Sequence, residues 1–285
     1  VTAVLWATTL LGSARAARLI GPWSTLAWVM VIGLSVAVPL VVLTGSSVTL
    51  TERDAVNMAI AGVANSGGLL LGYAALRRGK VAAVGPVVST EGAIAAVLAV
   101  IAGDPLTTAA AIILAVIAVG VVLASVERSS DRVMADDARP RPDLTGRSAA
   151  ITAGLALGAA VLFGINLFVT SRIANALPLA WSILPARLAG AALVGVPLVL
   201  ARRIRLTREA APFVILVALA EVGGIAAFAV GARDSAPIAS VIASQFAGIA
   251  AIAAFVIYGE RLNRIQVIGV VVIAAGVALL TAVRA

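Results

Sequence analysis

Three ionisable side chains stand in the middle of long apolar stretches of this sequence. They are Glu91, Arg187 and Glu221. A charged group near the centre of a bilayer-spanning segment costs about 3 kcal/mol or more, so such residues usually face a protein interior or a water-filled cavity. A carboxylate in that position can bind a cation or carry a proton, and a guanidinium can hold a carboxylate or a phosphate. The three residues therefore predict a buried polar site.

The same three residues also allow a purely structural interpretation. Arg187 could form an internal ion pair with one of the two glutamates and so lock two helices together. Two acids against one base would still leave one carboxylate without a fixed partner. This surplus acid favours coupling to a proton or to another cation, and both interpretations of Arg187 stay open.

Other polar and aromatic residues lie near the same depth or at the ends of apolar segments. Trp28 and Trp181 could line a cavity or anchor their segments at the membrane interface. The full set predicted to bind substrate or a coupling ion is Glu91, Glu221, Arg187, Asn65, Gln245, Ser244, Ser89, Trp28 and Trp181. The sequence has no His and no Cys, and we predict no catalytic group, no metal site and no cofactor.

The composition indicates a membrane protein. Hydrophobic residues make up 62% of the 285 residues, charged residues only 12%, and the mean hydropathy is +1.12. A soluble domain of this size cannot cover that much apolar surface with polar side chains. The net charge of +8 comes from Arg residues between apolar segments, which favours contacts with lipid headgroups over nucleic acid. We therefore predict an all-α integral membrane protein.

Ten apolar segments can be marked, and most are joined by short connections. They cover residues 3–20, 23–43, 55–75, 81–102, 108–125, 149–171, 179–200, 211–231, 237–257 and 266–283. The long connection, residues 127–147, is charged, contains two prolines and predicts a solvated linker. The predicted units are thus 1–126 and 148–285, each with five transmembrane helices.

The two units are related by an internal repeat. Residues 78–124 align with 234–280 at an offset of 156 positions without a gap. The same offset places Pro22 on Pro178, Gly67-Gly68 on Gly223-Gly224, and Asn65 on Glu221. Because five helices is an odd number, two copies in one chain must enter the membrane in opposite orientations. Inverted repeats of this kind are typical of secondary transporters, which bind substrate near the midplane between the repeats.

One polar turn carries a resemblance to a known family. The turn Gly259–Arg264, followed by Gln266, Gly269, Gly276 and Val277, resembles the EamA-type repeat of the drug/metabolite transporter superfamily. The first copy departs from this pattern, with Asp104-Pro105 in place of Glu-Arg and Ala110 and Ile113 in place of Gln and Gly. The resemblance covers the chain as two EamA-like units. It implies export or exchange of small metabolites across the inner membrane of a prokaryote.

The expected function is secondary active transport of a small organic metabolite or drug by alternating access, with a cavity lined by segments 3, 4, 6, 7, 8 and 9. The expected partners are a small-molecule substrate and membrane lipids, with protons as a candidate coupling ion and no nucleic acid. We expect a monomer or a weak homodimer. The alternatives are a membrane enzyme, which would need a cluster of nucleophile, base or metal ligands, and a channel-like protein, which would show rings of charge or a filter segment.

Most Arg and Lys residues share one face, which places both termini outside, whereas the resemblance implies termini inside.

Overall fold

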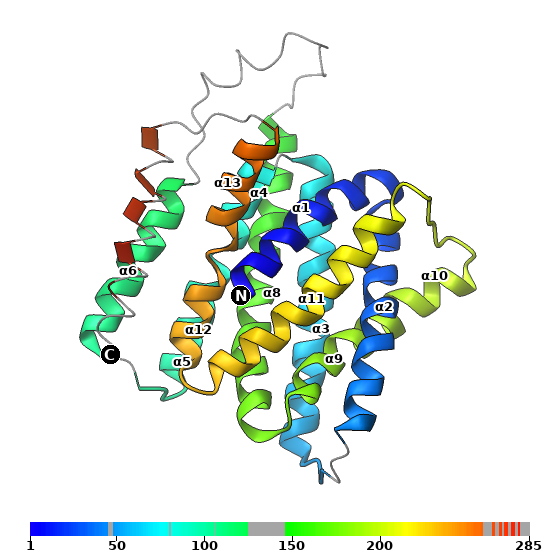
Figure 1. Ribbon diagram of the computed structural model, residues 1–285, viewed down its shortest axis with the longest axis horizontal. Coiled ribbons are helices and arrows are strands. Elements are labelled where there is room, and N and C mark those ends of the chain that lie inside the picture. The colour runs from blue at the N-terminus through cyan, green and yellow to red at the C-terminus, as the bar shows by residue number, and fades with distance from the viewer. Residues whose placement is uncertain are drawn as a thin grey trace.

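A computed structural model describes residues 1–44, 48–79, 81–105, 107–124 and 146–258, together with single positions and pairs between 264 and 279. In these residues every regular element is a helix (Figure 1). The elements are α1 (Thr2–Ile20), α2 (Pro22–Leu43), α3 (Glu52–Arg78), α4 (Val81–Val88), α5 (Glu91–Ile101), α6 (Thr108–Ala124), α8 (Gly146–Ala176), α9 (Ala180–Gly190), the π-helical turn η1 (Ala191–Gly195), α10 (Val196–Leu200), α11 (Ala211–Ala232), α12 (Ala236–Ala243) and α13 (Phe246–Tyr258).

Six helical spans in the described residues are long and apolar enough to cross a membrane. They are Pro22–Leu43, Glu52–Arg78, Val84–Ile101, Ala150–Ala176, Ala180–Leu200 and Ala211–Ala232. This agrees with the predicted all-helical membrane class. The predicted count of ten stays a prediction, because segment 266–283 is described only at scattered positions. The linker predicted at 127–147 lies outside the described residues except at its end, and so do residues 259–263 of the family turn.

Two of the predicted segments are interrupted helices. Segment 81–102 is α4 followed by α5, and segment 237–257 is α12 followed by α13. In the first break Pro86 lacks a backbone N–H, and the Ser89 hydroxyl donates a hydrogen bond of 2.8 Å to the Pro86 carbonyl. In the second break Ser244 and the Gln245 amide both donate to the Val241 carbonyl, at 2.8 and 2.9 Å. Polar side chains thus donate hydrogen bonds to backbone carbonyl groups close to the end of each interrupted helix.

The two breaks lie at matching places in the two halves and close to each other in space. Helix α4 ends at residue 88 and α12 at residue 243, within one residue of the 156-residue offset. Helix α5 packs on α12 at Gly92, where an added Cβ would lie 2.6 Å from the Ser240 carbonyl oxygen. Only glycine permits this approach, so the residue that begins α5 is held beside the break of the other half.

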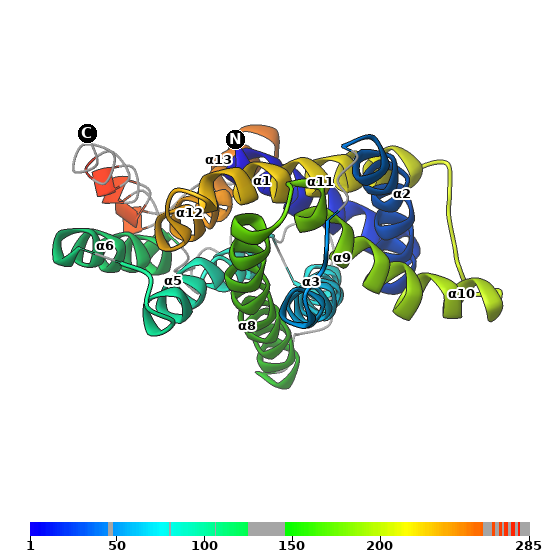
Figure 2. The ribbon, with the colours of Figure 1, turned by 90° about the horizontal axis from the view of Figure 1, so that it is seen from below.

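The most extensive contacts between the halves are those of two helix pairs. Helix α1 packs along α11, and α3 packs along α8 (Figure 1). Figure 2 shows these two pairs on opposite sides of the central bundle, with α6 at one edge and α10 at the other. First-half and second-half helices therefore alternate around the centre of the molecule.

Each pair is built on one of the Gly-Gly dipeptides that the repeat aligns. An added Cβ at Gly67 would meet Leu162, and one at Gly68 would lie 2.7 Å from the Phe163 ring. In the other pair Leu5 covers Gly223 and the Trp6 indole covers Gly224. Leu5-Trp6 and Leu162-Phe163 are themselves 157 positions apart. The glycines thus leave room for large side chains of the opposite half. Small residues commonly allow such close packing between membrane helices.

Candidate functional site

A cavity lies between the α1–α11 pair and the α3–α8 pair. Its wall is completed by α4, α5 and α13, the elements on either side of the two breaks. The cavity volume is about 60 Å³. Since one water molecule needs about 10–15 Å³ on this scale, the space holds about four waters or one small organic molecule. The expected lining included segment 7 (residues 179–200) and left out segment 1 (residues 3–20). In the structure α1 of segment 1 lines the cavity, and no described residue of α9 in segment 7 does.

Glu91 is the first residue of α5 and borders the cavity. Its exposed fraction is 4%, and its carboxylate makes no hydrogen bond or ion pair with any residue that the structure describes. The break between α4 and α5 places a helix N-terminus at this carboxylate. The N-terminal end of a helix carries a partial positive charge, which favours an anion there. The break therefore positions one acid on the wall without neutralising it.

Glu221 is the second acid on the wall, and Arg187 accompanies it from behind. The Arg187 Nη2 and Glu221 Oε2 atoms are 3.8 Å apart, and Arg187 on α9 is 0% exposed. The Arg187 side chain lies over Gly33 of α2, and its Nη1 contacts the Met30 sulfur at 3.6 Å. At 3.8 Å the pair is an ion pair without a hydrogen bond. Arg187 thus offsets the charge of Glu221 while remaining outside the cavity.

Several polar atoms at the cavity have no hydrogen-bond partner among the described residues. They are Trp6 Nε1, Thr9 Oγ1, Asn65 Oδ1, the Tyr73 hydroxyl and Glu221 Oε2. A buried polar atom left without a partner costs about 1–3 kcal/mol. Native proteins keep such groups where they serve a purpose, and here they converge from three helices on one space.

The structure brings three of the nine predicted site residues to the cavity. These are Asn65, Glu91 and Glu221. Asn65 and Glu221 are equivalent positions of the repeat, on α3 and α11, and both are more than nine-tenths buried. Their shared depth follows from the matched packing of the two helices.

The other six predicted residues have different surroundings. Ser89, Ser244 and Gln245 bind local carbonyl groups at the helix breaks, directly beside the wall. Arg187 reaches the site only through Glu221, as described above.

The two predicted tryptophans also lie off the wall. Trp28 donates its indole N–H to the Arg205 carbonyl at 3.1 Å and so fastens the connection after α10. Trp181 packs against two clusters of the apolar core. A single polar or aromatic residue in an apolar segment thus did not reveal which way its side chain points.

The first helix of each half supplies wall residues that the sequence reasoning missed. Thr9 and Leu10 on α1, and Asn166 and Leu167 on α8, border the cavity at positions 157 residues apart. Trp6, Tyr73, Phe163 and Phe246 add aromatic surface. The sequence signal that could have found these residues is the internal repeat. It extends into the first segment of each half, where the offset is 157 positions instead of 156.

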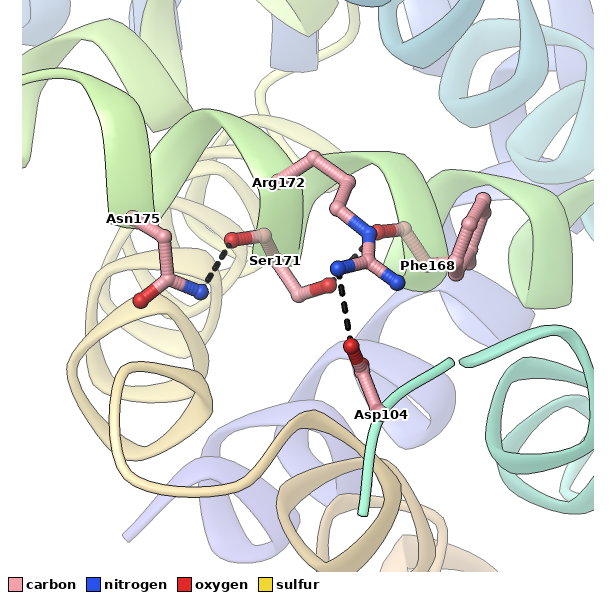
Figure 3. Close-up of polar contacts among 5 residues, drawn as sticks. All are labelled: Asp104, Phe168, Ser171, Arg172 and Asn175. Atoms are coloured by element: carbon pink, nitrogen blue, oxygen red, sulfur yellow. Dashed lines mark hydrogen bonds and ion pairs between the residues drawn. The ribbon is translucent and has the colours of Figure 1, made fainter. Parts of the chain in front are cut away.

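A second polar cluster lies away from the cavity, where the turn after α5 meets α8 (Figure 3). The Arg172 Nη1 and Asp104 Oδ1 atoms are 2.8 Å apart, and the guanidinium carbon lies 4.9 Å from the centre of the Phe168 ring. The turn itself contains Gly103, whose φ of +94° favours glycine. The cluster ties a turn of the first half to a helix of the second.

Comparison with known proteins places the chain in a family. The model of the EamA-like transporter family matches residues 1–126 and 150–282, so the chain belongs to this family. The suspected EamA-type transporter of the drug/metabolite transporter superfamily is thereby confirmed, and the family is one of transporters rather than of enzymes. Together with the six apolar helices, this makes the chain a multi-pass membrane protein.

The fold is shared with a solved protein. A crystal structure with a TM-score of 0.75 and 17% sequence identity covers 99% of this chain, which covers 94% of that one. At this identity the likeness concerns the fold alone. No curated protein matches the sequence.

Proposed function

We propose that the chain is a secondary active transporter that exports or exchanges a small organic molecule across the inner membrane of a prokaryote. The observation that carries this proposal is the cavity, which is enclosed between the two helix pairs. It is bordered by a carboxylate and by several polar atoms that have no partner in the part of the chain that the structure describes. A mostly apolar pocket with a few convergent polar groups is the usual form of a small-molecule site. Since one chain encloses the whole cavity, we propose the monomer as the transporting unit.

The matched contacts between the halves support an alternating-access mechanism. The α1–α11 and α3–α8 pairs use equivalent Gly-Gly dipeptides to receive equivalent large side chains. In an inverted repeat, equivalent contacts lie on opposite sides of a pseudo-twofold axis in the membrane plane. We propose ten helices in two inverted units, in which loosening of one pair opens the cavity to one side of the membrane and loosening of the other pair opens it to the opposite side.

Glu91 is the group that we propose for proton coupling. It is a carboxylate inside the membrane without an ion-pair partner among the described residues, and such groups are typical of proton relays. The other charged or titratable groups around the cavity are Glu221 with its partner Arg187, and Tyr73. A substrate and a proton that occupy Glu91 in turn would couple their movements in opposite directions.

Transport in proteoliposomes tests the proposal. Vesicles that contain the purified chain are loaded with a mixture of amino acids, nucleosides, sugars and amines, and the efflux of each compound is followed by mass spectrometry with and without a pH gradient. We expect at least one compound to leave faster than from protein-free vesicles. We also expect the pH gradient to change that rate in the wild type but not in Glu91→Gln. Equal leakage of every compound from both kinds of vesicle would contradict secondary transport.

A further inference from the structure

We infer that the cavity takes a small organic monocation with a flat apolar body, such as a protonated arylalkylamine. This inference rests on the proposed transport function and names the substrate class of the same site. It is carried by the charges around the wall, by the aromatic surface and by the donors and acceptors that have no partner within the described ranges of the chain.

The fixed charges around the cavity leave a negative excess. Glu221 faces Arg187 at 3.8 Å, which offsets one of the two acids. Glu91 has no cationic partner among the described residues. None of the described residues that line the cavity is Arg or Lys. An organic cation would neutralise this excess with one ionic contact to Glu91, because it brings a single positive charge.

The same arrangement disfavours an anionic substrate. A bound carboxylate or phosphate would approach both Glu91 and Glu221. The guanidinium that pairs with Glu221, that of Arg187, is fully buried and lies over Gly33 rather than at the wall. Like charges at short range in a medium of low dielectric repel each other strongly. A zwitterion would bring the same carboxylate into this environment.

The aromatic surface fits the body of such a cation. Trp6, Tyr73, Phe163 and Phe246 all border the cavity. The Trp6 ring is held by Phe228 at a centroid distance of 6.1 Å and by Phe246 at 6.4 Å in an edge-to-face arrangement. Rings fixed in this way offer flat apolar surface for a planar ligand and negative faces for a cation.

The size of the cavity limits the ligand. A volume of about 60 Å³, enough for about four waters, corresponds to one small ring with a short chain. The Tyr73 and Thr9 hydroxyl groups and the Asn65 carbonyl have no partner among the described residues and could accept from an ammonium group. A cation of this size can therefore meet Glu91 and at least one neutral acceptor together.

Three probes of one shape test the charge preference. Phenethylamine, 2-phenylethanol and phenylacetate carry a positive, no and a negative charge at neutral pH. Their binding to the purified full-length chain in detergent is measured by isothermal titration calorimetry. We expect phenethylamine to bind at least tenfold more tightly than 2-phenylethanol, and phenylacetate to bind more weakly than either. Equal or tighter binding of phenylacetate, or no binding of phenethylamine, would overturn the inference.

Matched variants assign the preference to one residue. Glu91→Gln keeps the shape of the side chain and is expected to weaken phenethylamine binding at least tenfold while leaving 2-phenylethanol binding within about twofold. Retained binding of the neutral probe shows that the variant is folded. Glu209→Gln is the control, because Glu209 lies exposed in the connection between α10 and α11 and should change neither affinity. An unchanged preference in Glu91→Gln would overturn the assignment.

Failure of this inference is distinguishable from failure of the proposed function. If the wild type transports neutral or anionic compounds but neither binds nor moves phenethylamine, the chain is a transporter and the substrate class is wrong. If phenethylamine binds in a Glu91-dependent manner but no compound crosses the membrane, the site is correctly assigned and the transport proposal fails.

Discussion

The α1–α11 contact and the α3–α8 contact are two versions of one packing arrangement. In each, the first helix of one half lays a leucine and an aromatic ring over a Gly-Gly dipeptide in the third helix of the other half. The polar residues nearby do not match. Helix α11 carries Glu221 with its partner Arg187, whereas α3 carries the neutral Asn65 at the equivalent position.

This difference separates packing from chemistry. Close approach of two helices in lipid depends on small residues and on shape, so both copies must keep their glycines and large side chains. The residues that only border the cavity are free of that requirement. The cavity wall therefore has acids on α11 and α5 and neutral polar residues on α3 and α8, although the scaffold around it is nearly symmetric.

The largest effect is expected when the ion pair between Arg187 and Glu221 of α11 is broken. Arg187→Met leaves Glu221 buried without its partner and is expected to lower the free energy of unfolding by about 3 kcal/mol. Asn65→Leu on the neutral side removes an oxygen that has no partner among the described residues, and should cost about 1 kcal/mol or less. Thermal unfolding in detergent measures both changes.

A double variant serves as the control for the charge effect. Arg187→Met combined with Glu221→Gln removes both charges, so most of the lost stability should return. A double variant as unstable as Arg187→Met alone would show that the packing of Arg187 over Gly33, rather than its charge, matters most.

The next effect tests the glycines. Gly224→Ala drives a methyl group into the Trp6 indole, which Phe228 and Phe246 hold in place. Overpacking of this kind costs about 1–3 kcal/mol, and it should push Trp6 into the cavity and abolish transport. Gly68→Ala meets Phe163, which is only partly buried and can shift, so its effect should be smaller. Equal losses of stability and transport in the two variants would show that the pairs are equally rigid.

A smaller effect is expected where the turn after α5 is tied to α8. Arg172→Ala and Asp104→Ala should each lower stability, and a double-mutant cycle should give a coupling energy of about 1 kcal/mol. The value is modest because both side chains keep partial access to solvent, at 28% and 21%. A coupling energy near zero would mean that the contact does not hold the two halves together.

The smallest effect has the opposite sign. Gly154 lies in α8 with no atom within 4 Å of an added Cβ. Gly154→Ala should therefore raise the free energy of unfolding by about 0.5 kcal/mol, through the lower entropy of the unfolded backbone. Chemical denaturation would measure the gain, and a loss would mean that another molecule or lipid contacts this surface.

Much of the fold could be predicted because it depends on local composition and on spacing. Long apolar runs predict membrane helices, and the repeat predicted which glycines would be equivalent. The breaks in segments 81–102 and 237–257 were harder to anticipate. Their signals are Pro86 in one case and only Ser244 and Gln245 in the other, and the same polar residues could equally have lined a site.

The site could be predicted only in part. Glu91 and Glu221 stand out because burying an acid in lipid is expensive, and Asn65 follows from the repeat. Trp6 and Thr9 do not stand out in an apolar segment. Their importance depends on which face of α1 turns toward the cavity, and α1 has neighbours on several sides.

The sequence by itself determined the membrane class, the family and the presence of one more acid than base inside the membrane. Each of these follows from residue type and order. The tertiary structure decided which acid is paired. Arg187 and Glu221 meet because α9 and α11 converge on one side of the bundle, while the break before α5 leaves Glu91 at the wall without a cation among the described residues. That outcome depends on distances between helices far apart in the chain, which residue order alone does not specify.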